Sequence, residues 1–211
     1  MAVRRDVRCN PRHALGFCFF AAAVSGDFSL DPTITPQRLT ACTVEDVKAN
    51  QFDQVVGPLT DILMACVEQG ASIGFLETPN AEDAFSFWYG VSGSLVSGGR
   101  RLLVARFGGQ IVGTVQLVLA APANGRHRAE ISKLLVHPDV RRKGVARVLM
   151  QQSEAIARAD GRSLLFLETR TGDAAESLCN TLGFELAGIV PAYARSTTGK
   201  LSDSSFMYKR I

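Results

Sequence analysis

The chain has 211 residues, of which 46% are hydrophobic and 20% charged, with a formal net charge of +3. This length predicts one domain with a substantial core, and the small net charge gives no reason to expect a nucleic-acid partner. No apolar run reaches the ~18–20 residues of a membrane-spanning helix. The five cysteines are odd in number and lack metal-ligand spacing, so free thiols in a reducing cytoplasm are expected.

The N-terminus combines four arginines within residues 1–13 with an apolar run over residues 14–24. This order resembles a secretory signal peptide. The alternative is a non-structural extension or a start codon placed too early. We favour the alternative and place an N-terminal extension at 1–33 and the folded domain at 34–211.

The first part of the domain is expected to contain a short strand and two helices. Residues 37–42 have strand composition, and Thr43 is a suitable N-cap for a helix that runs to about Glu68. Pro58 should break or kink this helix. Asn80 is the expected cap of a second helix.

The rest of the domain is rich in strands. Residues 101–107 and 111–120 are β-rich and are joined by a Gly-Gly-Gln hairpin signal. The elements expected after them are strand 129–136, helix 144–159, strand 164–168, helix 173–182, strand 184–189 and strand 205–209. Hairpin-connected strands with one strand–helix–strand crossover predict an α/β fold with a mixed sheet.

The stretch from Leu134 to Arg147 joins an apolar strand, a loop with proline, a basic turn with glycine and the first turn of a helix. The first N–H groups of a helix have no internal partner, and the N-terminus carries partial positive charge. Arg141, Arg142 and Lys143 add three cations. The order therefore predicts a site for a pyrophosphate. The alternative is a basic helix cap without a ligand.

Residues 141–146 fit the Gln/Arg-x-x-Gly-x-Gly/Ala signature of the GNAT superfamily of N-acetyltransferases, and Leu182-Gly183-Phe184 adds to the resemblance. The resemblance implies a mostly antiparallel central sheet with one parallel crossover pair and helices on both faces. It also implies acetyl-CoA as cosubstrate, without a metal, and a backbone N–H near Leu135–Val136 that polarises the thioester carbonyl. The residues implied in cofactor binding are Leu135, Val136, Arg141, Arg142, Lys143, Gly144, Val145, Ala146 and Arg147.

Three further stretches, 70–75, 122–135 and 186–201, resemble the tabtoxin-resistance acetyltransferases, a branch that acts on a β-lactam dipeptide toxin. The resemblance covers roughly residues 34–211. It implies a small primary amine as acceptor, of the antibiotic or toxin class, and direct transfer in a ternary complex.

Two carboxylates are candidates for the base that deprotonates the amine. Glu130 shares its side of the expected strand with Leu134 and Val136, and Glu168 ends the next apolar strand, where desolvation raises a carboxyl pKa. The resemblance places acidic residues at both positions. The alternative is that they pair with Arg128, Lys133 or Arg170.

Cys179 stands where many relatives have a tyrosine that protonates the departing thiolate. A free thiol has a pKa of ~8.5, but it is a weak hydrogen-bond donor and shorter than tyrosine. Cys179 is therefore either a substitute acid or a small packing residue, with water as the proton source. The donor role has otherwise moved, for example to Tyr193, or been lost.

Tyr193, Trp88 and Tyr89 are candidates for lining the amine pocket, although core packing explains Trp88 equally well. Aminoglycosides are an alternative substrate, because polycations favour an acidic cleft and Glu77, Glu82 and Asp83 lie in the 70–90 region.

Two other functions stay open: acetylation of proteins or peptides, and a non-catalytic acyl-CoA-binding sensor, which the cysteine at position 179 would suit. Homodimer formation through the apolar segment 71–76 is a further expectation.

Overall fold

The structure is a computed structural model that describes residues 42–211, so the predicted extension lies outside the described residues. In chain order the helices and strands are β1 (Thr43–Val47), α1 (Phe52–Glu68), α2 (Ala81–Val96), β2 (Arg100–Phe107), β3 (Gln110–Leu119), β4 (Arg128–Val136), α3 (Val145–Ala159), β5 (Leu164–Arg170), α4 (Ala174–Thr181), β6 (Glu185–Arg195) and β7 (Leu201–Arg210).

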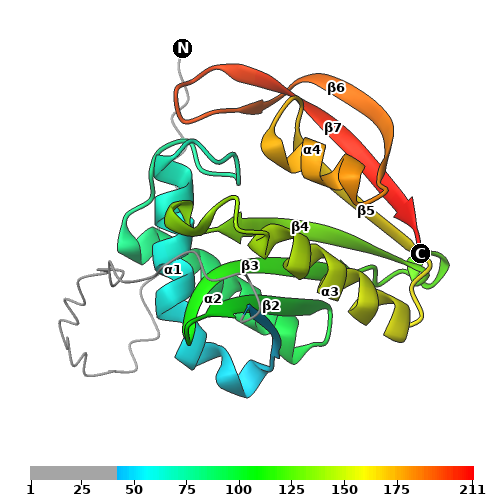
Figure 1. Ribbon diagram of the computed structural model, residues 1–211, viewed down its shortest axis with the longest axis horizontal. Coiled ribbons are helices and arrows are strands. Elements are labelled where there is room, and N and C mark those ends of the chain that lie inside the picture. The colour runs from blue at the N-terminus through cyan, green and yellow to red at the C-terminus, as the bar shows by residue number, and fades with distance from the viewer. Residues whose placement is uncertain (1–41) are drawn as a thin grey trace, which may run out of the picture. The chain divides into compact units, whose positions relative to one another are not determined.

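The seven strands form one mixed sheet in the order β1-β2-β3-β4-β5-β7-β6 (Figure 1). Neighbouring strands run antiparallel except β4 and β5, which run parallel and are connected through α3. The predicted mixed sheet with a single crossover pair is confirmed.

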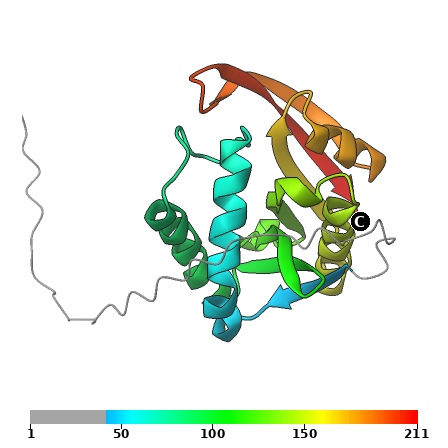
Figure 2. The same ribbon diagram turned by 60° about the vertical axis from the view of Figure 1, so that its left-hand side comes forward.

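Helices cover both faces of the sheet, as predicted (Figure 2). Because side chains alternate along a strand, Leu102 and Val104 of β2 pack with α1 and α2, whereas Leu103 and Ala105 belong to the core beneath α3. Among residues 42–211, no helix is long and apolar enough to cross a membrane.

The predicted start of the first helix is wrong. Residues Thr43–Val47 form β1, which pairs with β2, and the helix begins only at Phe52. The ladder is reinforced by ion pairs from Glu45 to Arg106 at 2.9 Å and from Asp46 to Arg101 at 3.2 Å. These cross-strand contacts outweigh the local capping pattern. The strand expected at 37–42 lies outside the described residues except for Cys42, which precedes β1.

Helix α1 also runs through Pro58 without ending. Proline removes the hydrogen bond to the carbonyl four residues earlier, here that of Gln54. Both residues are exposed, so water is available to this carbonyl. The buried stripe on the opposite side, which includes Leu59, Ile62 and Leu63, continues past the proline and holds the helix on the sheet.

The predicted hairpin is confirmed: Phe107 pairs with Gln110, and the loop residues Gly108 and Gly109 have φ angles of 57° and 84°. Positive φ at both loop positions is the conformation that favours glycine in a two-residue hairpin. Strands β6 and β7 extend beyond the predicted 184–189 and 205–209.

Gly113 on β3 lets α3 approach the sheet closely. A Cβ at this position would lie 3.0 Å from the Leu135 carbonyl oxygen, 3.2 Å from Val145 Cγ1 and 3.3 Å from Leu149 Cδ1. The backbone carbonyl cannot move without shifting β4. The missing side chain therefore fixes the height of the first turn of α3 above the ends of β3 and β4.

We expect Gly113→Ala to lower the free energy of unfolding by about 1–3 kcal/mol, because overpacking strains a tight core. Gly57→Ala is the matched control: nothing lies within 4 Å of a Cβ there, and alanine raises helix stability by roughly 0.5–1 kcal/mol. Urea unfolding of both variants measures the difference. Equal stability of Gly113→Ala and the native chain would contradict this packing.

Candidate active site

Strands β4 and β5 separate along their length. Their parallel pairing covers only Arg128–Glu130 against Leu164–Phe166, although β4 continues to Val136 and β5 to Arg170. Beyond Glu130, β4 keeps its pairing with β3, and β5 keeps its pairing with β7. The two strands thus leave an opening inside the sheet, with strand edges that have lost their partner.

A β-bulge in β4 lies where the pairing with β5 has ended. Gln116 pairs with Ser132 and Thr114 pairs with Leu135, so two residues of β4 oppose one residue of β3. Lys133 lies in the bulge with a φ of 52°, a conformation uncommon for residues with a side chain. The bulge bends β4 and reverses the side-chain alternation after it, so Leu134 and Val136 pack on the same side as Ala129 and Ile131. The prediction that Glu130 shares its side of the strand with Leu134 and Val136 is therefore wrong.

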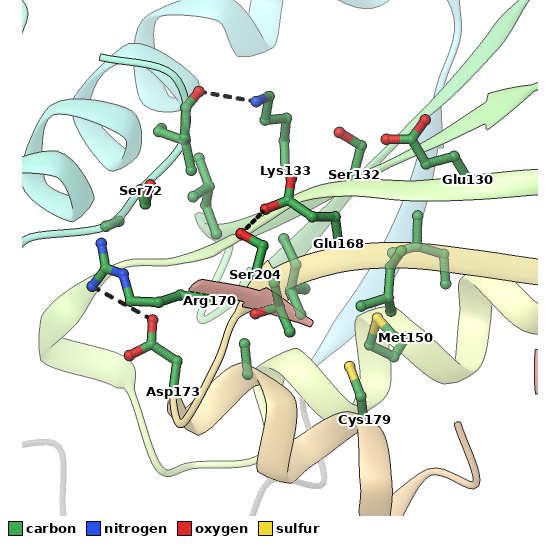
Figure 3. Close-up of a pocket in the computed structure, with 18 residues that line it drawn as sticks. Ser72, Glu130, Ser132, Lys133, Met150, Glu168, Arg170, Asp173, Cys179 and Ser204 are labelled. Atoms are coloured by element: carbon green, nitrogen blue, oxygen red, sulfur yellow. Dashed lines mark hydrogen bonds and ion pairs between the residues drawn. The ribbon is translucent and has the colours of Figure 1, made fainter. Parts of the chain in front are cut away.

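The opening forms a cavity of about 260 Å³ (Figure 3). Its walls come from β4, β5, the chain after α1, and helices α3 and α4. The lining side chains used below are Ser72, Ile73, Glu130, Lys133, Leu135, Met150, Glu168, Arg170, Asp173, Cys179 and Ser204.

Both predicted carboxylates line this cavity. The Oε1 atom of Glu168 accepts a hydrogen bond of 2.6 Å from the Ser204 hydroxyl on β7, which fixes the carboxylate. The ion pair of Arg170 is with Asp173, at 3.7 Å. Neither Glu130 nor Glu168 has an ion pair within 4.0 Å among the described residues, so the predicted alternative of paired carboxylates is not observed.

Lys133 brings a cation between these carboxylates. Its Nζ donates a 2.9 Å hydrogen bond to the carbonyl of Ile73 and lies 5.9 Å from the centre of the Phe87 ring. Burial lowers the pKa of Lys133, and the charges of Glu168 and Glu130 act in the opposite direction. The ammonium therefore shares this face of the cavity with two negative groups.

Cys179 lines the cavity from α4, near Met150 of α3 (Figure 3). The side chain is almost fully buried, with 3% of its surface exposed. Burial and the nearby charge of Glu176 raise the pKa of Cys179 to about 11. At neutral pH the group is consequently a thiol in a largely apolar wall.

The turn after β4 presents backbone N–H groups at the surface. Gly144 is the N-cap of α3 with a φ of 86°, and Arg142 has a φ of 63°. No side chain caps the helix, and its first turn contains no acidic residue. The N–H groups and the partial positive charge of this end are thus available to an anion.

Arg141 was expected to add a cation to the pyrophosphate site, but its guanidinium is directed at β4 and α1. Its Nε donates to the Val136 carbonyl at 3.3 Å, and an Nη atom lies 3.7 Å from the Cys66 sulfur on α1. The Cys66 thiol also donates to the Val136 carbonyl, at 3.4 Å. Arg141 therefore ties the turn to the end of β4. All three cations are exposed, but Arg142 and Lys143 make no such contact among the described residues.

The register of β4 identifies which backbone N–H faces the opening. His137 N–H bonds to the Val112 carbonyl of the chain leading from β3. Alternate residues of an antiparallel strand direct their backbone groups to opposite edges, so Leu135 is turned toward β3 and Val136 toward β5. Of the two predicted positions, Val136 is the one whose N–H points to the opening.

The three predicted aromatic residues do not line the cavity. Trp88 is 0% exposed and packs in the core between α1 and α2, so the alternative prediction of core packing is confirmed. Tyr89 is 51% exposed and contacts the rings of Phe52 and Phe85. Tyr193 on β6 is 52% exposed and contacts the ring of Phe206 edge-on. Aromatic character therefore did not identify residues of the cavity.

Lys133 and Ser204 belong to the site although the sequence did not predict either of them there. One signal was present: Ser132-Lys133 interrupts an otherwise apolar strand. Ser204 gives no comparable signal, because its role depends on the pairing of β5 with β7. Within residues 42–211, no group of three or more His, Cys, Asp or Glu side chains is placed to hold a metal ion.

Comparisons with known proteins identify the family of this chain. The model of the acetyltransferase (GNAT) family matches residues 61–184. The chain is 35% identical, over 131 residues, to a protein of Azospirillum brasilense described as an uncharacterized N-acetyltransferase in the hisH-hisA intergenic region, covering 59% of this chain and 76% of that protein.

Solved structures show the same fold at lower identity. A phosphinothricin acetyltransferase of the GNAT superfamily from Sinorhizobium meliloti, in complex with AcCoA, matches with a TM-score of 0.64 and 21% identity over 81% of this chain and 89% of that one. A ribosomal-protein-alanine N-acetyltransferase from Brucella melitensis matches with a TM-score of 0.64 and 23% identity over 80% and 99%.

The raised pKa of Cys179 predicts how its alkylation by iodoacetamide depends on pH. A thiol with a pKa of about 11 is roughly 0.1% thiolate at pH 8, whereas a free cysteine is roughly 25% thiolate. We expect the alkylation rate of the peptide that contains Cys179, followed by mass spectrometry, to rise up to about pH 11. The measured quantity is the pH at which the alkylation rate reaches half of its maximum, because burial also slows the absolute rate. A half-maximal pH near that of N-acetylcysteine would contradict the raised pKa of Cys179.

Proposed function

This chain belongs to the GNAT family of acetyltransferases, and we propose that it transfers the acetyl group of acetyl-CoA to a primary amine of a small molecule, directly and within a ternary complex. The observation that carries the proposal is the opening between β4 and β5. One strand, β4, lines the cavity with its carboxylate and lysine and then leads directly into the anion-binding turn of α3.

The residues of the turn fit the pyrophosphate of acetyl-CoA. The uncapped end of α3 offers N–H groups from Val145 to Arg147, and Arg142 and Lys143 add exposed charges. Acetyl-CoA supplies the activated acetyl group. The N–H of Val136 is the proposed donor to the thioester oxygen, because an N–H that is already fixed in a strand costs no reorganisation when charge develops.

Glu168 is the proposed base. The Ser204 hydroxyl holds one of its oxygens, which leaves the other to accept a proton from the ammonium of the acceptor, directly or through a water molecule. Glu130 lies on the same cavity and is the second candidate. The amine attacks only when unprotonated, so one of these carboxylates must take the proton first.

The thiolate of CoA, whose acid has a pKa of ~8.5, is proposed to leave as the anion and to take its proton from bulk solvent after release. Cys179 is the proposed packing residue beside it. A proton transfer from a thiol of pKa about 11 to a thiolate whose acid has a pKa of ~8.5 is uphill by about 3 kcal/mol. Tyr193, the other residue considered for this role, lies on β6 outside the cavity lining.

The charges of the cavity favour a small acceptor of mixed polarity over a polycation. The lining contains Lys133 and Arg170 together with three carboxylates, so it lacks the strongly acidic character that an aminoglycoside requires. Glu77, Glu82 and Asp83 do not line it. We therefore keep a small amine, of the toxin or antibiotic class that the tabtoxin-resistance resemblance implies, as the proposed acceptor.

A thiol-release assay tests the proposed activity. Purified protein with acetyl-CoA is screened against amino acids, dipeptide toxins, polyamines and aminoglycosides, and free CoA is measured. Acetyl-CoA binding without CoA release from any amine would favour the sensor function over the enzyme. Release with aminoglycosides alone would contradict the mixed-polarity acceptor.

The variant Ala146→Asp is expected to weaken acetyl-CoA binding without lowering the thermal stability of the protein. An acidic residue in the first turn stabilises a helix by about 0.3–1 kcal/mol, but here it faces the proposed pyrophosphate. We expect the Kd for acetyl-CoA to rise about tenfold or more through charge repulsion, while thermal stability stays equal or increases. Calorimetric titration measures this, with Ala146→Asn as the uncharged control. Unchanged binding by Ala146→Asp would place the pyrophosphate elsewhere.

Glu168→Gln keeps the size of the side chain and an oxygen for the Ser204 hydroxyl, but removes the base. We expect kcat to fall by roughly 10²–10⁴-fold without loss of acetyl-CoA binding, measured by CoA release and by calorimetry. Glu130→Gln is the matched variant within the same cavity. A larger effect of Glu130→Gln than of Glu168→Gln would transfer the role of base to Glu130.

A further inference from the structure

Lys133 has hydrogen-bonding capacity that the protein does not use. Its ammonium has three N–H donors. Among the described residues its hydrogen bond is to the Ile73 carbonyl, its ring contact is with Phe87, and no carboxylate lies within 4.0 Å of it. A half-buried ammonium at a cavity wall that retains free donors is suited to bind an anion.

Arg170, the other cation of the lining, has both Nη atoms engaged, and its Nε is buried and therefore not accessible to a ligand. One Nη atom donates to the Gly70 carbonyl at 3.1 Å and the other lies 3.7 Å from Asp173. Both Nη atoms of Arg170 therefore connect segments of the cavity wall and are not directed at a ligand. Lys133 is therefore the cation of the cavity that is available to an acceptor molecule.

A second cation, Arg100 of β2, lies close enough to Lys133 for its charge to act on the ammonium. Arg100 does not line the cavity, so a ligand in the cavity would contact Lys133 and not Arg100. The positive charge of Arg100 nevertheless adds to that of Lys133 and favours an anion at this part of the wall.

The opposite charge lies on the next strand. Glu168 on β5 is held by Ser204 on one side only, and its charge acts on Lys133 across the opening between β4 and β5 (Figure 3). The cavity thus presents a carboxylate and an ammonium side by side. A molecule that carries an amine next to an acid matches both, whereas a simple amine leaves the ammonium of Lys133 unpaired.

We propose that the acceptor is a zwitterion of the amino-acid type, whose amino group is received by Glu168 and whose acid group is bound by the ammonium of Lys133. This inference rests on the proposed function, because the amine held at Glu168 is the one that is acetylated. Lys133 is then a specificity-determining residue that rejects amines without a neighbouring negative charge.

The test compares each standard amino acid with its amide, for example leucine with leucinamide, as acceptors in the CoA-release assay. We expect kcat/KM of the best acids to exceed that of their amides by about 10- to 100-fold, the range of a hydrogen bond to a charged group. In Lys133→Met this preference disappears and in Lys133→Arg it returns. Lys48→Met, an exposed lysine outside the cavity, serves as the control and keeps the preference.

Binding of the same pairs to the protein saturated with CoA, measured by calorimetry, keeps the inference testable if turnover is absent. An acid preference that is lost in Lys133→Met supports the inference even without CoA release, and the absence of release then counts against the proposed function alone. Equal binding of acids and amides overturns the inference. It is overturned equally if Lys133→Met weakens both members of each pair by the same factor, because Lys133 would then only hold Ile73.

Discussion

The site depends on one constraint: β4 cannot stay paired with both of its neighbours along its whole length. Parallel pairing with β5 ends at Glu130, and the bulge that contains Lys133 then bends β4 while it remains bonded to β3. In a closed sheet the same residues would face each other across a continuous ladder. The separation instead creates a cavity within the sheet and leaves the Val136 N–H without a partner strand, at the cost of one residue held at positive φ.

The two halves of the site are held together by packing rather than by a flexible loop. Gly113 allows the first turn of α3 to settle on β3 and β4, and Arg141 returns from the turn to the Val136 carbonyl. The N-terminal end of α3, which is the proposed anion site, is therefore fixed relative to the strand that carries Lys133. Such rigidity suits a reaction in which a large cofactor and a small acceptor must meet at one point.

Local patterns in the sequence predicted the features that depend on a few consecutive residues. The strand–turn–helix order around residues 141–147 and the Gly108-Gly109 hairpin are examples. The mixed sheet was predicted from the order of the elements along the chain, and Glu130 and Glu168 both line the cavity. Features that depend on distant partners were missed. Thr43 caps no helix because β2 draws it into a strand, Trp88 belongs to the core, and the contact between Ser204 and Glu168 requires the pairing of β5 with β7.

The opening between β4 and β5, together with the start of α3, is the proposed binding site of acetyl-CoA. Hydrogen–deuterium exchange of individual backbone amides, measured by NMR with and without acetyl-CoA, tests it most directly. If acetyl-CoA binds there, the amide of Val136 and those of residues 145–147 become protected together, while the amides of β1 stay unchanged. Protection confined to other parts of the chain, or none at Val136, would show that acetyl-CoA does not bind in this opening.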